Sequence, residues 1–170
     1  SDRKGKEFNP ATGTGTLVLR QNFVNSIITS ESPDNLTVKI TGYTIISSHA
    51  FHSNKKIMKV IIGDSVERIY DKVFANCDNL TSVTFGEKSR LQSIGEEAFR
   101  ECTKLTSINI PDSVTSIGNT AFRDCYSLTS VTFGEKSRLE SIGDEAFFLC
   151  SALTSINIPD SVTSIGNSAF

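Results

Sequence analysis

The sequence predicts a mostly β fold in which short repeats stack into a solenoid. The stretch from Thr81 to Phe122 returns 48 residues later, from Thr129 to Phe170, and only 7 of its 42 positions differ. Within this long repeat a shorter one is visible, because phenylalanine recurs at alternating intervals of 25 and 23 residues. It stands at Phe74, Phe99, Phe122, Phe147 and Phe170. A fixed period in the twenties indicates repeats that stack on one another, each forming one coil of the solenoid.

Length, composition and charge are those of one globular domain. The 170 residues are 38% hydrophobic and 21% charged, which argues against a disordered chain. The 17 basic and 19 acidic residues give a net charge of -2 and form no long basic cluster, so nucleic acid and anionic membranes are disfavoured as partners. No apolar run approaches the roughly 18 residues that cross a bilayer, so membrane insertion is not expected.

Three segments follow one another along the chain. Residues 1–15 are polar and contain glycine, as expected of a flexible start or tag remnant. Residues 16–35 carry two short β-branched runs and are expected to form a hairpin-like cap on the first coil. Residues 36–170 form the predicted solenoid of about six coils, the last of which is expected to be truncated at Phe170. The coils begin near Leu36, Ile57, Leu80, Leu105, Leu128 and Leu153.

One coil, from Cys102 to Phe122, illustrates how each part of the repeat is expected to fold. Ile108 and Ile110 alternate with polar residues, which predicts a strand with one inward face. A turn and a second short extended segment follow, and Gly118 is expected to end that segment with a positive φ. Asn119 to Asp124 is too short for a full helix, so it is expected to form one helical or 3-10 turn that carries Phe122 inward.

The repeat resembles a known family. The order C-x-x-L-x-x-I-x-I-P-x-x-V-x-x-I-G-x-x-A-F, at Cys102–Phe122 and Cys150–Phe170, is similar to the BspA-like, or treponemal-type, leucine-rich repeat. The coils at Cys77 and Cys125 follow it with Gly in place of Pro and two extra residues, and Asn54 departs from it where Cys is expected. The resemblance implies a curved, right-handed parallel β-solenoid with its longer strands on the concave face. It also implies a secreted or cell-surface protein that acts in adhesion and protein binding.

The cysteines and histidines are expected to have structural roles. The cysteines recur with the period of the repeat, so each occupies the same place in its coil. They are Cys77, Cys102, Cys125 and Cys150. Their side chains would run parallel, whereas disulfides and zinc sites need converging ones, so buried free thiols are predicted. His49 and His52 flank Phe51, with no acid or cysteine nearby to complete a dyad, and a surface turn is expected. We therefore predict no enzyme, no catalytic residue, no cofactor and no metal.

Two surfaces are candidates for binding a protein. The first is the outward face of the predicted concave strands, where small polar side chains recur, although such a lattice could also be a merely solvated sheet. It comprises Ser82, Thr84, Ser107, Asn109, Ser130, Thr132, Ser155 and Asn157. The second is a pair of identical charged loops, two coils or roughly 10 Å apart, that are expected to protrude on one edge. It comprises Glu87, Lys88, Arg90, Glu135, Lys136 and Arg138.

One difference between the two long copies adds a third candidate surface. Arg100 and Glu101 in the first copy become Phe148 and Leu149 in the second, so the last coil is more apolar on its turn side. If exposed, these two side chains would indicate a contact with another chain, another domain or a missing C-terminal segment, including self-association through the open last coil.

The sequence thus predicts a non-enzymatic, extracellular or cell-surface module that binds protein partners. The expected partners are surface or matrix proteins of a host or a neighbouring cell. The alternative is a structural spacer that holds other domains away from a cell surface and has no ligand of its own. The full-length gene would separate the two, since a long repeat array with an anchor favours the spacer and a terminal repeat domain favours the binder.

Overall fold

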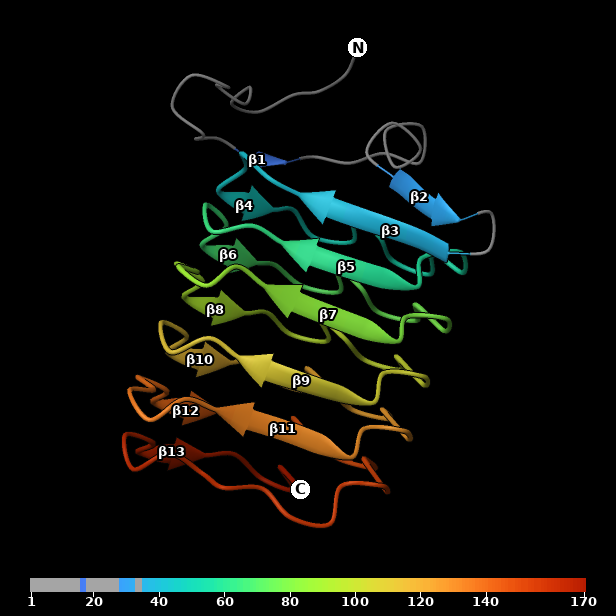
Figure 1. Ribbon diagram of the computed structural model, residues 1–170. Helices are drawn as coiled ribbons and strands as arrows, with labels where there is room; N and C mark the ends of the chain where they lie inside the picture. Colours follow the sequence, from blue (N-terminus) through green and yellow to red (C-terminus); the bar gives the residue numbers. More distant parts are fainter. Residues whose placement is uncertain (1–15, 18–27, 33–34) are drawn as a thin grey trace.

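The fold is a parallel β-solenoid, which confirms the mostly β prediction. A computed structural model describes residues 16–17, 28–32 and 35–170. Successive coils stack along one axis, with long strands on one side and short strands on another (Figure 1). The predicted flexible start at residues 1–15 lies outside the described residues, and so does much of the predicted cap. In the described part no helix is present, so none is long and apolar enough to cross a membrane.

The long strands form one wall of the solenoid. β3 (Asn35–Ile40), β5 (Lys59–Ile62) and β7 (Ser82–Phe85) pair in parallel, as do β9 (Ser107–Ile110) and β11 (Ser130–Phe133). β9 lies beside β7, so the row continues through both groups (Figure 1). β2 (Ile28–Ser32) lies antiparallel on the outer edge of β3. The parallel pairing joins equivalent positions of successive repeats, so the outward residues line up in rows.

The short strands form a second wall, two residues wide and parallel throughout. They are β1 (Thr16–Leu17), β4 (Ile45–Ile46), β6 (Arg68–Ile69), β8 (Ser93–Ile94), β10 (Ser116–Ile117), β12 (Ser141–Ile142) and β13 (Ser164–Ile165). From β4 to β12 the second residue of each strand is a buried isoleucine. Each coil therefore fixes this wall to the core with one branched apolar side chain.

The third side of each coil differs from the helical or 3-10 turn that the sequence predicts. Thr120 and Asp124 have φ angles of 54° and 63°, in the left-handed region. The backbone N–H groups of Thr120, Phe122 and Asp124 donate to carbonyl oxygens of the next coil, at distances of 2.8, 2.7 and 2.9 Å. A helix would use such groups within its own turn. The prediction was wrong because alternate N–H groups bond to the next coil. The intervening N–H groups of Ala121, Arg123 and Cys125 close single turns onto the residue three earlier, so no continuous helical turn forms.

A column of phenylalanine rings fills the core beside this third side. Successive rings stack nearly parallel, with centroids 5.2 to 5.6 Å apart. The column comprises Phe51, Phe74, Phe99, Phe122, Phe147 and Phe170. All but the last are at most 2% exposed. The recurrence of phenylalanine that defines the repeat is therefore explained by packing.

Gly95, Gly118, Gly143 and Gly166, which follow the short strands, form a glycine column. This column allows close packing of the coils and does not supply a positive φ. Of the described glycines only Gly42 has φ in the left-handed region, so the expectation for Gly118 was wrong. A methyl group on Gly118 would lie 2.7 Å from backbone atoms of Gly95 and Glu96 in the preceding coil. Real side-chain carbons do not approach backbone so closely, so this position accepts only glycine without moving the coils apart.

The last coil is covered by a neighbour on one side only. Ile165 and Phe170 are 50% and 52% exposed, whereas their equivalents one coil earlier, Ile142 and Phe147, are at most 2% exposed. Residues 155–158, which correspond to β11, are not assigned as a strand. The burial of each coil therefore depends on neighbours above and below, as expected of a repeat protein.

Candidate functional site

Small polar side chains cover the outward side of the long strands, as the alternation predicts. We call this surface the long-strand face. It is formed by Ser82, Thr84, Ser107, Asn109, Ser130, Thr132, Ser155 and Asn157, of which Ser82 and Ser130 are half-buried and the others exposed. Thr132 donates a hydrogen bond from its hydroxyl to the amide oxygen of Asn109, at 3.2 Å. The face offers hydroxyl and amide groups without a net charge.

The two charged loops are fixed to the preceding coil. In the first loop, the carboxylate of Asp64 accepts a hydrogen bond from the backbone N–H of Lys88, at 3.1 Å. The carbonyl oxygen of Asp64 accepts another from Nε of Arg90, at 3.3 Å. In the second loop, the backbone N–H of Arg138 donates to the carbonyl oxygen of Asp112, at 2.9 Å. The charged residues predicted as a site are all exposed: Glu87, Lys88, Arg90, Glu135, Lys136 and Arg138.

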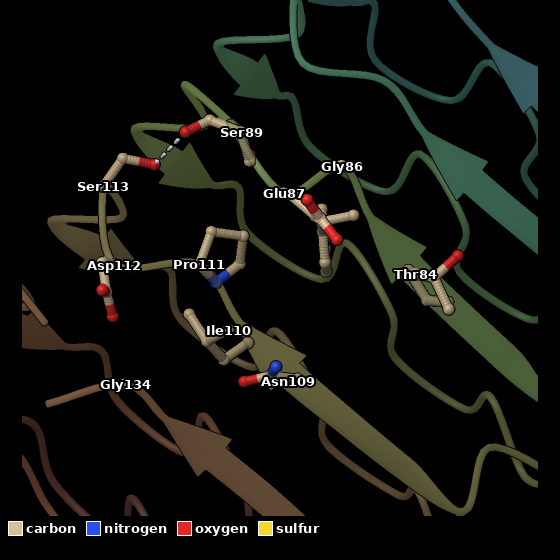
Figure 2. Close-up of a pocket in the computed structure, with 12 residues that line it drawn as sticks. Thr84, Gly86, Glu87, Ser89, Asn109, Ile110, Pro111, Asp112, Ser113 and Gly134 are labelled. Carbon is tan, nitrogen blue, oxygen red and sulfur yellow. Dashed lines mark hydrogen bonds between the residues drawn. The ribbon is translucent and has the colours of Figure 1, made fainter.

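Two pockets lie where the long-strand face meets these loops. The first, shown in Figure 2, has a volume of about 490 Å³ and lies between Thr84 to Ser89 of one coil and Asn109 to Ser113 of the next. The second, about 300 Å³, lies between Phe133 to Ser137 and Asn157 to Ser161. Every lining position of the second pocket is the first pocket's residue shifted by 48, and Gly134 borders both. The long repeat thus builds the same pocket twice.

The pockets contain residues that the sequence analysis did not select. Phe85, Pro111 and Asp112 line the first pocket, and their equivalents line the second. The repeat pattern predicts a turn for Pro111 and Asp112, and none of the three is among the predicted site residues. The sequence does carry a signal for the pockets. Each Gly-Glu-Lys-Ser loop is followed one coil later by a Pro-Asp-Ser turn, so the loop and the turn lie beside each other in the stack.

The cysteines form a column of thiols that donate to the preceding coil. The four Sγ–H groups donate to the carbonyl oxygens of Phe51, Phe74, Phe99 and Phe122, at 3.0 to 3.2 Å. All four cysteines are free and buried, as predicted. Burial raises the pKa of Cys77 to about 12, and burial is also the largest cause of the raised pKa of Cys102. Cys77 and Cys102 therefore act as structural donors and are poor nucleophiles.

Cys150 is expected to be alkylated before the other cysteines. Pairing with the neighbouring Cys125 thiol lowers the pKa of Cys150, whereas the same pairing, followed by burial, raises the pKa of Cys125. Cys150 also borders an apolar hollow of about 190 Å³ beside Phe170. Its thiolate fraction and its access should therefore both exceed those of the other thiols. Timed iodoacetamide labelling with peptide mass spectrometry measures the order, with Cys150→Ser as the control. Equal rates at all four cysteines would contradict the expectation.

Phe148 and Leu149, which are predicted to contact another chain or domain, are only partly exposed. The guanidinium carbon of Arg123 lies 5.2 Å from the centroid of the Phe148 ring, a cation–π geometry, and the same guanidinium pairs with Glu145. Leu149 is 46% exposed. Phe148 therefore already has a partner within the chain, and the predicted contact with another chain stays a prediction that rests mainly on Leu149.

His49 and His52 lie on the surface, with ring centroids 5.5 Å apart. Burial lowers the pKa of His52, and the neighbouring His49 lowers it further. Within the described ranges, no group of three or more His, Cys, Asp or Glu residues could hold a metal ion. The features that the described side chains do form are the two pockets and the polar long-strand face.

Comparison with known proteins agrees with this geometry. The model of the BspA type leucine-rich repeat region matches residues 44–170 in 6 copies. A leucine-rich repeat protein from Eubacterium ventriosum is 28% identical with a TM-score of 0.70, over 77% of this chain and 35% of that one. A leucine-rich cell surface protein from Faecalibacterium prausnitzii is 28% identical with a TM-score of 0.52, over 84% and 49%. The pneumococcal vaccine antigen PcpA shares the fold, at 22% identity and a TM-score of 0.63, over 82% and 43%. No curated protein matches the chain.

A parallel solenoid with one long and one short strand per coil, and a phenylalanine column beside the third side, agrees with a leucine-rich repeat protein. The chain belongs to the BspA type leucine-rich repeat family, whose model covers residues 44–170. It spans less than half the length of each of the three solved proteins named above.

Proposed function

We propose that the chain is a non-enzymatic module that binds protein partners through the long-strand face and the two charged loops, outside the cell or on its surface. The observation that carries the proposal is the continuity of an exposed polar face with two pockets whose lining residues repeat 48 positions apart. Leucine-rich repeat solenoids commonly bind partners along such extended surfaces. The surface location is supported by the solved cell surface protein of Faecalibacterium prausnitzii, 28% identical to this chain.

A four-residue variant tests the proposal. Thr84, Asn109, Thr132 and Asn157 are replaced together by tyrosine, which fits a strand but projects a large ring from the face. Wild type and variant are compared for binding to an immobilised panel of purified surface and matrix proteins. We expect partner binding to fall at least about tenfold while the thermal midpoint stays within a few degrees, because the changed side chains point to solvent.

A matched control places the same ring elsewhere. Gln92→Tyr and Glu140→Tyr change exposed residues beside the short-strand wall and should leave binding intact. Equal binding by the four-residue variant would reject the long-strand face. A wild-type chain that binds no member of the panel would favour the spacer, the second candidate function.

A further inference from the structure

The two pockets are neighbours with a repeated chemistry, and together we call them the groove. Gly134 borders both, so the groove runs along the edge of the long-strand face across successive coils. The first pocket is bounded by the ring of Phe85 and by Pro111, and the second by Phe133 and Pro159. Figure 2 shows Pro111 between Glu87 and Asp112 in the first pocket. A side chain entering either pocket would therefore meet an apolar wall and carboxylates.

The charged side chains that line the groove are all acidic. They are Glu87 and Asp112 in the first pocket and Glu135 and Asp160 in the second, and all four are exposed. The cations of the same loops are not among the lining residues, and Arg90 is turned back to the carbonyl oxygen of Asp64. An arginine or lysine suits such a pocket, since its apolar stem packs on the ring and proline while its charged end meets the carboxylates.

The spacing of the pockets selects the conformation of the partner. Two coils at the spacing of paired strands separate equivalent points by about 9.6 Å. A polyproline II helix repeats every three residues, or about 9.3 Å. A β-strand presents side chains on one face every ~6.7 Å, and an α-helix returns to the same face after seven residues, about 10.5 Å. At the paired strands, the polyproline II repeat is nearest to this spacing, whereas the 5.2 Å between successive phenylalanine rings gives about 10.4 Å for two coils, nearer to the helical repeat. A polyproline II segment also leaves its backbone free to bond with Thr84 and Asn109, which a helix does not, so this conformation is favoured.

We propose that this groove binds a polyproline II segment of a partner protein that carries arginine or lysine at every third position, with one basic side chain in each pocket. The inference rests on the protein-binding function proposed above and specifies the partner. Two weak contacts on one rigid ligand strengthen each other, so the pair should bind far better than either alone.

Peptide binding to the intact chain tests the inference. The probe is a fluorescent proline-rich 12-mer with arginine at every third position, and its anisotropy is followed at low ionic strength, where exposed charges are least screened. A second peptide of the same composition has its arginines at alternate positions. We expect the first to bind at least about tenfold more tightly, because only its spacing fills both pockets. Equal affinities, or no binding of the first peptide, would overturn the inference, as would tighter binding of a helical peptide with arginines seven apart.

Charge-neutral variants locate the site. Glu87→Gln with Asp112→Asn should weaken the first peptide at least about tenfold, since one pocket loses its carboxylates. Glu96→Gln with Glu140→Gln removes the same charge from exposed positions outside the groove and should leave affinity within about twofold. Equal losses of peptide affinity in both variants would mean that net charge alone drives binding. That result would overturn the proposal that the peptide binds in the groove. A chain that binds panel proteins but not the peptide contradicts this inference alone, whereas one that binds the peptide but no protein contradicts only the proposed function.

Discussion

Replacement of Phe99 by alanine is expected to lower the free energy of unfolding by about 3–5 kcal/mol. The Phe99 ring is fully buried and lies between Phe74 and Phe122, with both centroid distances 5.2 Å. Its neighbours cannot move into the vacated space, because each ring is fixed in its own coil by the backbone bonds that join the coils. A cavity would remain in the middle of the column. Urea unfolding followed by circular dichroism measures the loss.

Phe170→Ala is the matched control for this prediction. Phe170 belongs to the same column but stacks on one neighbour only, Phe147 at 5.6 Å, and is 52% exposed. Its removal should cost about 1 kcal/mol or less, because the side chain is half in water already. A loss at Phe99 no larger than the loss at Phe170 would show that the buried column is not a main source of stability.

Most of the fold could be predicted because the repeat encodes it locally. The alternation around Ile108 and Ile110 predicts β9, and both side chains are 2% exposed. Equal spacing of identical residues also predicts the register, since Ser107 pairs with Ser130, the same position one coil later. The cysteine column followed in the same way from its period. Such features depend on one coil and its copy, which the sequence displays directly.

The features that were missed depend on contacts between coils. Thr120 and Asp124 adopt positive φ although neither residue type requires it, so the local sequence carries no sign of the turn they form. The pockets arise only when the turn at Pro111 stacks beside the loop at Glu87 in the preceding coil. Most of the outward residues of the long strands are exposed, with Ser82 and Ser130 half-buried. Which of them a partner contacts is a property of the partner as well as of this chain.

Gly118→Ala is expected to destabilise the chain by about 1–3 kcal/mol, as an overpacked core position does. The sign of the change in the free energy of unfolding decides the interpretation. At an ordinary position, replacement of glycine by alanine stabilises the folded state by about 0.4–1 kcal/mol, because it restricts the unfolded chain. Here the new methyl group would lie 2.7 Å from the backbone of Gly95 and Glu96. That backbone cannot withdraw freely, since the N–H of Gly118 donates to the carbonyl oxygen of Ile94 at 2.8 Å.

Gly134→Ala supplies the comparison within the same chain. A methyl group there would lie 2.1 Å from a carboxylate oxygen of Asp112, which belongs to an exposed side chain that can rotate away. The free energy of unfolding should therefore change by less than about 1 kcal/mol, in contrast to Gly118. Urea titrations of both variants measure the difference. A Gly118 variant as stable as the wild type would mean that neighbouring coils can separate at little cost. The glycine column would then not fix the distance between coils on which the spacing of the two pockets depends.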